Sequence, residues 1–190
     1  MDLRGVVTPD RPLLVLAIEE EAAHLDVDLP VLLTGMGKVN AAAALATVLG
    51  RGPAPSAVVN LGTAGALQPG WTGTLEVGRV LQHDLDTDFL RALTGLTVGA
   101  PRTLTGTGPV LATGDSFIAE ETARARLAAH AHLVDMEGYA IVQVAQDAGV
   151  AVRVIKHVSD DAGDGAARTW QESVDGCARA LAEWVGRNLG

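Results

Sequence analysis

The chain has 190 residues, which suits one domain, and 48% of them are hydrophobic, enough for a sizeable core. Only 3% are aromatic, so we expect a core of Ala, Val and Leu, small side chains that pack helices closely onto a sheet. The net charge of −9 opposes contact with phosphate backbones and therefore argues against a nucleic-acid-binding protein.

The sequence also argues against a membrane or secreted protein. Residues 1–12 lack the apolar stretch of a signal peptide, and no uninterrupted apolar run approaches the roughly 18 residues of a membrane span. The single cysteine, Cys177, cannot form a disulfide within the chain, as expected for a reducing compartment. We therefore predict a cytoplasmic protein with one domain, residues 1–190.

Apolar runs and helical segments alternate along the first half of the chain. Continuous apolar runs predict buried strands over residues 13–18, 31–34 and 57–61. An acidic helical start follows the first strand, an Ala-rich helix follows the second, and a glycine-rich loop over residues 62–70 follows the third. Residues 74–84 predict one or two strands.

The alternation continues after a poorly patterned stretch, residues 84–108, where we predict a loop with a strand near 95–99. Further strands are predicted over 109–114, 132–136 and 151–158, and helices over 116–129, from Glu137 onward, and from Trp170 to Trp184. This order predicts an α/β fold, a single-domain three-layer sandwich whose central mixed, mainly parallel sheet is flanked by helices.

Four predicted strands end in polar or glycine-rich sequence. The segments are AIEEE (17–21), NLGTAGAL (60–67), VDMEG (134–138) and HVSDDAGD (157–164). In open α/β sheets, ligands bind outside the carboxyl ends of the strands. We therefore expect several of these segments to converge on one pocket.

Each acidic segment also has a purely structural explanation. Acids in a first helical turn, such as Glu19–Glu21, complement the helix dipole. Asp135 and Glu137 suit a helix start, and Ser159 with Asp160 suits a cap or an Asx-turn. The functional alternative for Glu137 is ribose recognition, because one carboxylate can accept hydrogen bonds from two adjacent hydroxyls.

No motif points to a metal or an organic cofactor. The glycines at 35–37 complete neither a P-loop nor a dinucleotide-binding motif, and the run SDDAGDG lacks the EF-hand order of ligands. The histidines are scattered and form no zinc-ligand set with the one cysteine.

Six segments occur in the order found in the purine-nucleoside phosphorylase/nucleosidase superfamily: AIEEE, TGMGKVNAA, VVNLGTAGAL, TGDSFI, VDMEGYAIVQVA and KHVSDDAGD. The chain resembles the 5′-methylthioadenosine/S-adenosylhomocysteine nucleosidases of that superfamily, from about Leu13 to the C-terminal helix. The resemblance implies a nucleoside phosphorylase-like fold, a small-molecule nucleoside as substrate, no cofactor and a homodimer.

The resemblance also implies roles for individual residues. Glu21 matches the acid that activates water, Asp160 the acid that protonates purine N7, and Glu137 the acid that binds the ribose hydroxyls. Met136 matches the residue that packs on the sugar, and Ser159 a residue that helps hold the base. The remaining matches are Phe117, which stacks on the purine, Ile118, whose backbone reads the base edge, and Thr63, Ala64 and Gly65, in the loop near water and ribose.

One position and one segment bear on the choice of nucleophile. Asn60 stands where phosphorylases of the superfamily place a phosphate-binding Arg, and the acids after the first strand would repel a phosphate dianion. Lys156 replaces the family's usual Arg and lacks its planar fork. Thr63 stands where the family usually has a Ser. The chain is also shorter than typical members of the family, and the missing residues fall in the stretch 84–108.

The leading hypothesis is therefore a nucleosidase that releases adenine from a 5′-modified adenosine. Bond cleavage builds positive charge on the ribose and negative charge on the purine, so an acid on the purine side and a base on the water side suit the reaction. The alternatives are a phosphate-dependent nucleoside phosphorylase, a futalosine-type hydrolase and a non-catalytic nucleoside-binding module.

Overall fold

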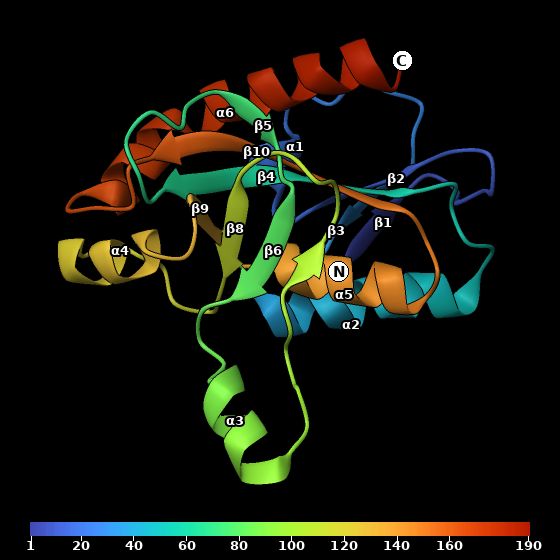
Figure 1. The fold of residues 1–190 in the computed structure, drawn as a ribbon. Coiled ribbons are helices and arrows are strands. Elements are labelled where there is room, and N and C mark those ends of the chain that lie inside the picture. Colours follow the sequence, from blue (N-terminus) through green and yellow to red (C-terminus); the bar gives the residue numbers. More distant parts are fainter.

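The computed structural model describes residues 1–190 and has the predicted α/β architecture (Figure 1). The strands are β1 (Asp2–Arg4), β2 (Leu13–Leu16), β3 (Val31–Leu33), β4 (Val58–Ala66), β5 (Thr74–Glu76), β6 (Arg79–Gln82), β7 (Arg102–Thr103), β8 (Val110–Thr113), β9 (Leu133–Asp135) and β10 (Val152–Asp160). The helices are α1 (Glu19–Ala22), α2 (Lys38–Arg51), α3 (Thr87–Thr94), α4 (Glu121–Ala128), α5 (Gly138–Asp147) and α6 (Ala166–Asn188).

All ten strands belong to one mixed sheet, with the order β1-β3-β2-β4-β9-β8-β6-β7, and β10 pairs with both β4 and β5. The pairs β2–β3, β2–β4, β4–β10, β6–β8 and β8–β9 are parallel, and the other pairs are antiparallel. Near the end of β4, Gly65 pairs with both β9 and β10, and Ala66 pairs with β9. This junction brings three of the four polar strand ends together.

Helices cover both faces of the sheet, with α1 and α6 on one face and α2 and α5 on the other (Figure 1). Alternate residues of β2 serve the two cores: Leu13 and Val15 pack with α2 and α5, whereas Leu14 and Leu16 pack with α6. All of these side chains are fully buried. Burial on both faces explains why β2 is a continuous apolar run rather than an alternating one.

The glycine-rich segment after Leu61 was predicted as a loop, which is wrong for its first half, because β4 continues to Ala66. The glycines there permit close approach rather than a turn. A Cβ on Gly65 would lie 2.9 Å from Asp160 Oδ1, and one on Gly62 would lie 3.1 Å from Lys156 Nζ and 3.2 Å from a Glu21 oxygen. Small residues in this strand therefore make room for the acids around it.

The stretch 84–108 also differs from the prediction, since it contains α3 and no strand near 95–99. Asp86 caps α3 by accepting a hydrogen bond from the Phe89 N–H at 2.9 Å, and Gly95 ends it with a φ of 74°. These are ordinary helix signals, but no residue of α3 is buried. The helix projects from the body of the molecule in Figure 1.

Two smaller differences concern element boundaries. The helix predicted over 116–129 begins only at Glu121, because the preceding residues run without regular structure. The short β1, which pairs with β3, was not predicted at all. None of the helices combines the length and the apolar character that a membrane crossing requires.

Candidate active site

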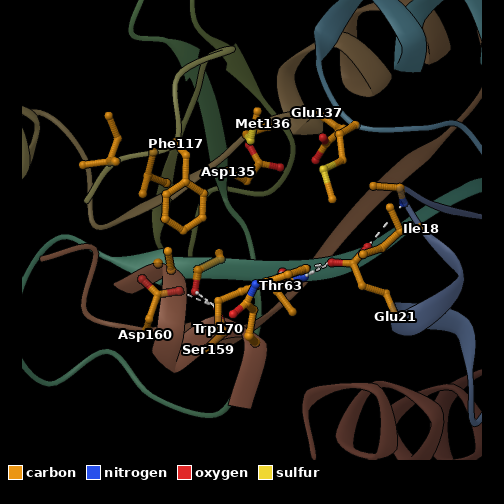
Figure 2. Close-up of a pocket in the computed structure, with 18 of the residues that line it drawn as sticks. Ile18, Glu21, Thr63, Phe117, Asp135, Met136, Glu137, Ser159, Asp160 and Trp170 are labelled. Atoms are coloured by element: carbon orange, nitrogen blue, oxygen red, sulfur yellow. Dashed lines mark hydrogen bonds between the residues drawn. The ribbon is translucent and has the colours of Figure 1, made fainter. Parts of the chain in front are cut away.

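A cavity of about 300 Å³ lies where the ends of β4, β9 and β10 meet the start of α6 (Figure 2). All ten residues predicted as catalytic or substrate-binding line it, although their roles remain predictions. They are Glu21, Thr63, Ala64, Gly65, Phe117, Ile118, Met136, Glu137, Ser159 and Asp160. The two supporting residues of the prediction, Asn60 and Lys156, lie outside the lining.

Glu21 is the one member of the acidic triplet that enters the cavity. Glu19 pairs with Arg4 at the surface and Glu20 is exposed, whereas Glu21 is only 5% exposed. The structural explanation from the helix dipole therefore suits Glu19 and Glu20, but it does not account for a buried Glu21.

The Glu21 carboxylate accepts hydrogen bonds from two neighbouring strand ends. Its Oε1 accepts from the Thr63 backbone N–H at 2.7 Å and from the Thr63 hydroxyl at 2.9 Å. Its Oε2 accepts only a longer bond, 3.3 Å, from the Ala17 N–H. This arrangement fixes one oxygen and leaves the other free to accept a proton from water.

Glu137 stands at the junction of β9 and α5, where it is 8% exposed. Its Oε1 accepts a hydrogen bond from the Gly37 N–H at 2.7 Å, so the glycine turn before α2 reaches this acid. Burial, and then the charge of Asp135, raise the pKa of Glu137 to about 7, against the opposing effect of Lys156. No sequence motif indicated this contact of Gly37 with Glu137.

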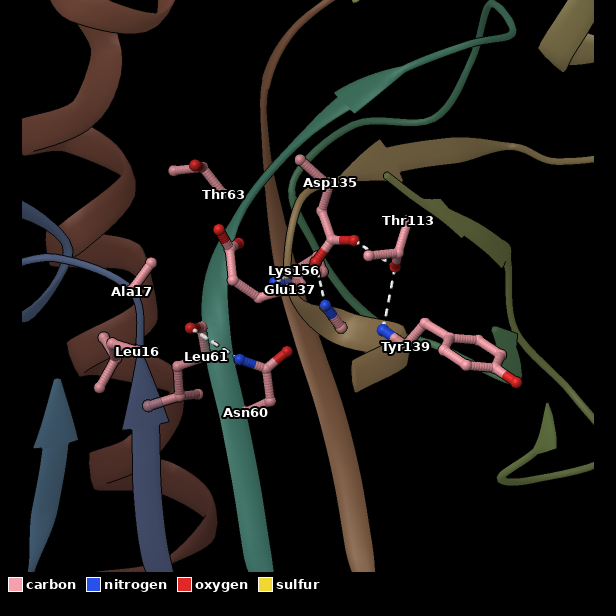
Figure 3. A network of polar contacts seen from close by, with 12 residues as sticks. Leu16, Ala17, Asn60, Leu61, Thr63, Thr113, Asp135, Glu137, Tyr139 and Lys156 are labelled. Atoms are coloured by element: carbon pink, nitrogen blue, oxygen red, sulfur yellow. Dashed lines mark hydrogen bonds and ion pairs between the residues drawn. The ribbon is translucent and has the colours of Figure 1, made fainter. Parts of the chain in front are cut away.

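Asp135 and Lys156 form a buried ion pair beneath Glu137 (Figure 3). The Lys156 Nζ lies 2.9 Å from Asp135 Oδ2, and both side chains are 2% exposed. Asp135 also accepts bonds from the Thr113 hydroxyl at 2.6 Å and from the Gly138 N–H at 2.8 Å. The bond to Gly138 agrees with the helix-start interpretation of Asp135, and the ion pair adds a second role.

Lys156 remains the cation of this cluster despite its environment. Burial lowers its pKa, but the surrounding carboxylates Asp135, Glu137 and Glu21 outweigh burial and raise the pKa overall. The ammonium group thus offsets part of the repulsion among the acids.

Asp160 combines a local turn with a place in the cavity. Its Oδ1 accepts a hydrogen bond from the Ala162 N–H, and its Oδ2 accepts one from the Ser159 hydroxyl, both at 2.8 Å. The Asx-turn interpretation is therefore correct for this residue, yet its carboxyl group also faces the cavity (Figure 2). Burial raises the pKa of Asp160. Asp160 therefore holds a proton more readily than an ordinary Asp does.

Apolar side chains form much of the rest of the wall. Phe117 is 48% exposed and lines the cavity instead of packing in the core, while Ile118 is buried beside it. Met136 lies between Phe117 and Glu137 in Figure 2. Trp170, which the sequence placed only on the apolar face of α6, also lines the cavity and hydrogen-bonds to Thr63.

The ionisable groups in the cavity wall are all carboxyl groups. Glu21, Asp135, Glu137 and Asp160 contribute carboxyl groups, and no Lys, Arg or His lines the cavity. Asn60 is buried in the sheet, where its Nδ2 donates to the Val15 carbonyl at 3.0 Å. No group of three or more His, Cys, Asp and Glu side chains is arranged to hold a metal ion.

Comparison with known proteins establishes the family. The sequence model that describes the phosphorylase superfamily matches residues 25–100 and 107–187 of the chain. The chain belongs to the phosphorylase superfamily. The family resemblance seen in the sequence is therefore confirmed, and so is the fold class.

Several members of this superfamily are similar to the chain. A 5′-methylthioadenosine/S-adenosylhomocysteine nucleosidase of Shewanella oneidensis is 31% identical over 164 residues, which cover 71% of this chain and 67% of the relative. The structure of the Helicobacter pylori nucleosidase D198N mutant with 5′-methylthioadenosine has a TM-score of 0.83 at 20% identity, covering 95% and 98% of the two chains. A mutant futalosine hydrolase of the same organism has a TM-score of 0.81 at 19% identity, covering 93% and 97%.

Proposed function

We propose that the protein is a purine nucleosidase that hydrolyses the N-glycosidic bond of a 5′-modified adenosine, of the methylthioadenosine or S-adenosylhomocysteine type, to adenine and the free ribose derivative. The observation that carries the proposal is a cavity with four carboxyl groups and no cation in its wall. Such a wall suits a neutral nucleoside and water, because it repels a phosphate dianion. A phosphorylase is therefore disfavoured.

The two catalytic acids would work from opposite ends of the cavity, where Figure 2 shows Asp160 and Glu21. Asp160, whose pKa is raised by burial, donates a proton to the purine and makes it a neutral leaving group. Glu21 accepts a proton from the attacking water through its less occupied oxygen, Oε2. Unequal surroundings thus give the two carboxyl groups opposite tasks.

The remaining wall residues would hold the substrate. In its ionised form, which predominates above a pKa of about 7, Glu137 accepts hydrogen bonds from the two ribose hydroxyls and stabilises positive charge that develops on the sugar. Met136 contacts the apolar face of the ribose, and the half-exposed ring of Phe117 is available to stack on the base.

The names of the relatives favour the methylthioadenosine and S-adenosylhomocysteine class over futalosine. The curated relatives are named as nucleosidases of that class, at 28–31% identity. The futalosine hydrolase is similar at 19% identity, which supports a shared fold alone.

A product assay tests the proposal. We expect the purified protein to release adenine from methylthioadenosine in phosphate-free buffer, with free methylthioribose as the second product. Activity that requires phosphate and yields a ribose 1-phosphate would establish a phosphorylase instead. Thermal stabilisation by nucleosides without turnover of any nucleoside in a panel, futalosine included, would indicate a binding module.

Matched variants test the assigned roles. We expect Glu21→Gln and Asp160→Asn to lower kcat by at least about 100-fold, the usual scale for losing a general acid or base. Glu20→Gln and Asp161→Asn are the controls, because each changes the exposed acid next in sequence. Full activity of both cavity variants would contradict the roles given to Glu21 and Asp160.

We also propose that the protein is a homodimer. Large apolar side chains are exposed on α3, after α3 and around the start of α2: Met36, Val39, Phe89, Leu93, Leu96 and Val98. An amphipathic helix with no buried residue is unusual for a monomer and suits a covered surface. We expect light scattering to give the mass of a dimer for the native protein and of a monomer for a Phe89→Asp/Leu93→Asp variant.

A cytoplasmic location is a further part of the proposal. Cys177 is buried and unpaired, as suits a reducing compartment. Fractionation of cells from the source organism would test it.

A further inference from the structure

A tryptophan from the C-terminal helix is connected to the proposed catalytic base. Trp170 lies in the second turn of α6, and its indole Nε1–H donates a hydrogen bond to Thr63 Oγ1 at 3.0 Å. Thr63 in turn contacts Glu21. We propose that Trp170 is a positioning residue for Glu21 and that it acts through the Thr63 hydroxyl; this rests on the nucleosidase function proposed above.

The direction of the two hydrogen bonds follows from donor counting. An indole N–H can only donate, whereas a hydroxyl has one hydrogen and can also accept. Thr63 Oγ1 therefore accepts from Trp170, and its own hydrogen is available for the Glu21 Oε1 at 2.9 Å. The order of donation is Trp170 to Thr63 to Glu21.

This order determines which Glu21 oxygen is available for water. The Thr63 hydroxyl and backbone N–H both donate to Oε1, whereas Oε2 accepts only the 3.3 Å bond from Ala17. Two short bonds to one oxygen hold the carboxylate in a single orientation. Without the indole N–H, the Thr63 hydroxyl is free to rotate its hydrogen away and to accept one from another group instead.

The geometry gives Trp170 a task that a phenylalanine could not perform. A phenylalanine at this position could form the same apolar wall of the cavity, but it has no group that donates to Thr63. The substitution Trp170→Phe therefore removes the hydrogen bond and keeps most of the packing. Trp184→Phe is the matched control, since it removes an indole N–H from the same helix, outside the cavity.

The experiment measures kcat and KM for adenine release by the wild-type protein and by variants at both positions. We expect Trp170→Phe to lower kcat about 5- to 10-fold, the scale of one hydrogen bond, with KM within about twofold of wild type. Trp184→Phe leaves both constants unchanged. Thr63→Val lowers kcat at least as much as Trp170→Phe, and Thr63→Ser, which keeps the hydroxyl, retains most of the activity.

A double-mutant cycle distinguishes action through Thr63 from a separate effect. In the Thr63→Val background, Trp170→Phe should change kcat by less than about twofold, because the hydroxyl that it acts on is already absent. In the Thr63→Ser background, the full loss should return. Equal losses in the wild-type and Thr63→Val backgrounds, or an unchanged kcat for Trp170→Phe, overturn the inference.

The inference stays testable if Trp170→Phe does not fold. A wild-type kcat for Thr63→Val shows that the hydroxyl is dispensable and overturns it without any change at Trp170. A wild-type protein that is inactive on all nucleosides overturns the proposed function, and the inference with it. An active wild-type protein with an additive cycle overturns the inference alone.

Discussion

Removal of the Lys156 ammonium group tests the balance of charge beneath the cavity. In Lys156→Met, the aliphatic part of the side chain is kept, but Asp135 loses its cation while it stays buried. The two other bonds of Asp135, from Thr113 and Gly138, remain. Glu137 also loses the one nearby positive charge that opposes the rise of its pKa.

The burial of the pair sets the size of the effect. Both side chains are 2% exposed, so the loss of one partner leaves a buried, uncompensated charge, which costs about 3–5 kcal/mol. In a domain of this size 1 kcal/mol shifts the melting temperature by about 2–4 °C, so we expect a fall of about 6–20 °C. The double variant Lys156→Met/Asp135→Asn removes both charges and should regain most of that loss.

Thermal melts at pH 7.5, with urea unfolding as a second measure, would check these values. The control is Lys38→Met, which removes the only other lysine, paired with Asp84 at a more exposed site where the two side chains are 17% and 27% exposed. We expect a smaller loss there. A melting temperature for Lys156→Met within about 2 °C of wild type, or a double variant no more stable than the single one, would refute the reasoning.

Three further predictions concern the substrate site. Glu137→Gln should lower kcat/KM for ribonucleosides about 10- to 100-fold and much less for 2′-deoxynucleosides, and equal loss on both would leave Glu137 a structural residue. Because the pKa of Glu137 is raised to about 7, the affinity for ribonucleosides should increase as the pH rises through 7. Folding favours the protonated form of Glu137, so the free protein should lose stability as the pH rises from about 4.5 to 7. Melts at several pH values should show this loss for the wild type and not for Glu137→Gln. Phe117→Ala should raise KM about 5- to 100-fold by loss of stacking, with little change in melting temperature because the ring is 48% exposed.

The parts of the fold that follow from local sequence were predictable. The continuous apolar run of β2 and the apolar periodicity of α5 both follow from burial of these side chains. The predicted positions of these two elements therefore agree with the structure. The end of β4 was missed because glycine usually weakens a strand, and only the close approach of Lys156 and Asp160 explains its presence there. The helix α3 was missed although it has a capping Asp86 and a terminal Gly95, because none of its residues is buried.

The lining of the cavity was predictable where its residues lie together in one segment at a strand end, whereas their roles are proposals. The acids Glu21, Glu137 and Asp160 stand in recognisable motifs, and the sheet brings these motifs to one cavity. The contacts between segments left no such signal. Gly37 donates to a residue 100 positions away, and Trp170 to one 107 positions away, so neither produces a local pattern.

The two departures from the family pattern, Lys156 and Thr63, have a physical explanation in the contacts that surround them. In the sequence, Lys156 lacks the planar fork that would orient water or a carboxylate. In the structure, its ammonium group pairs with Asp135, a residue of the cavity wall, but does not itself line the cavity, so no planar fork is needed for this single contact.

Thr63 then orients Glu21, the proposed catalytic base, because its hydroxyl and its N–H both donate to that carboxylate. Its β-branched side chain also restricts χ1. Because Trp170 supplies the hydrogen bond that leaves this hydroxyl as a donor to Glu21, the effect of a change at position 170 should depend on a hydroxyl at position 63.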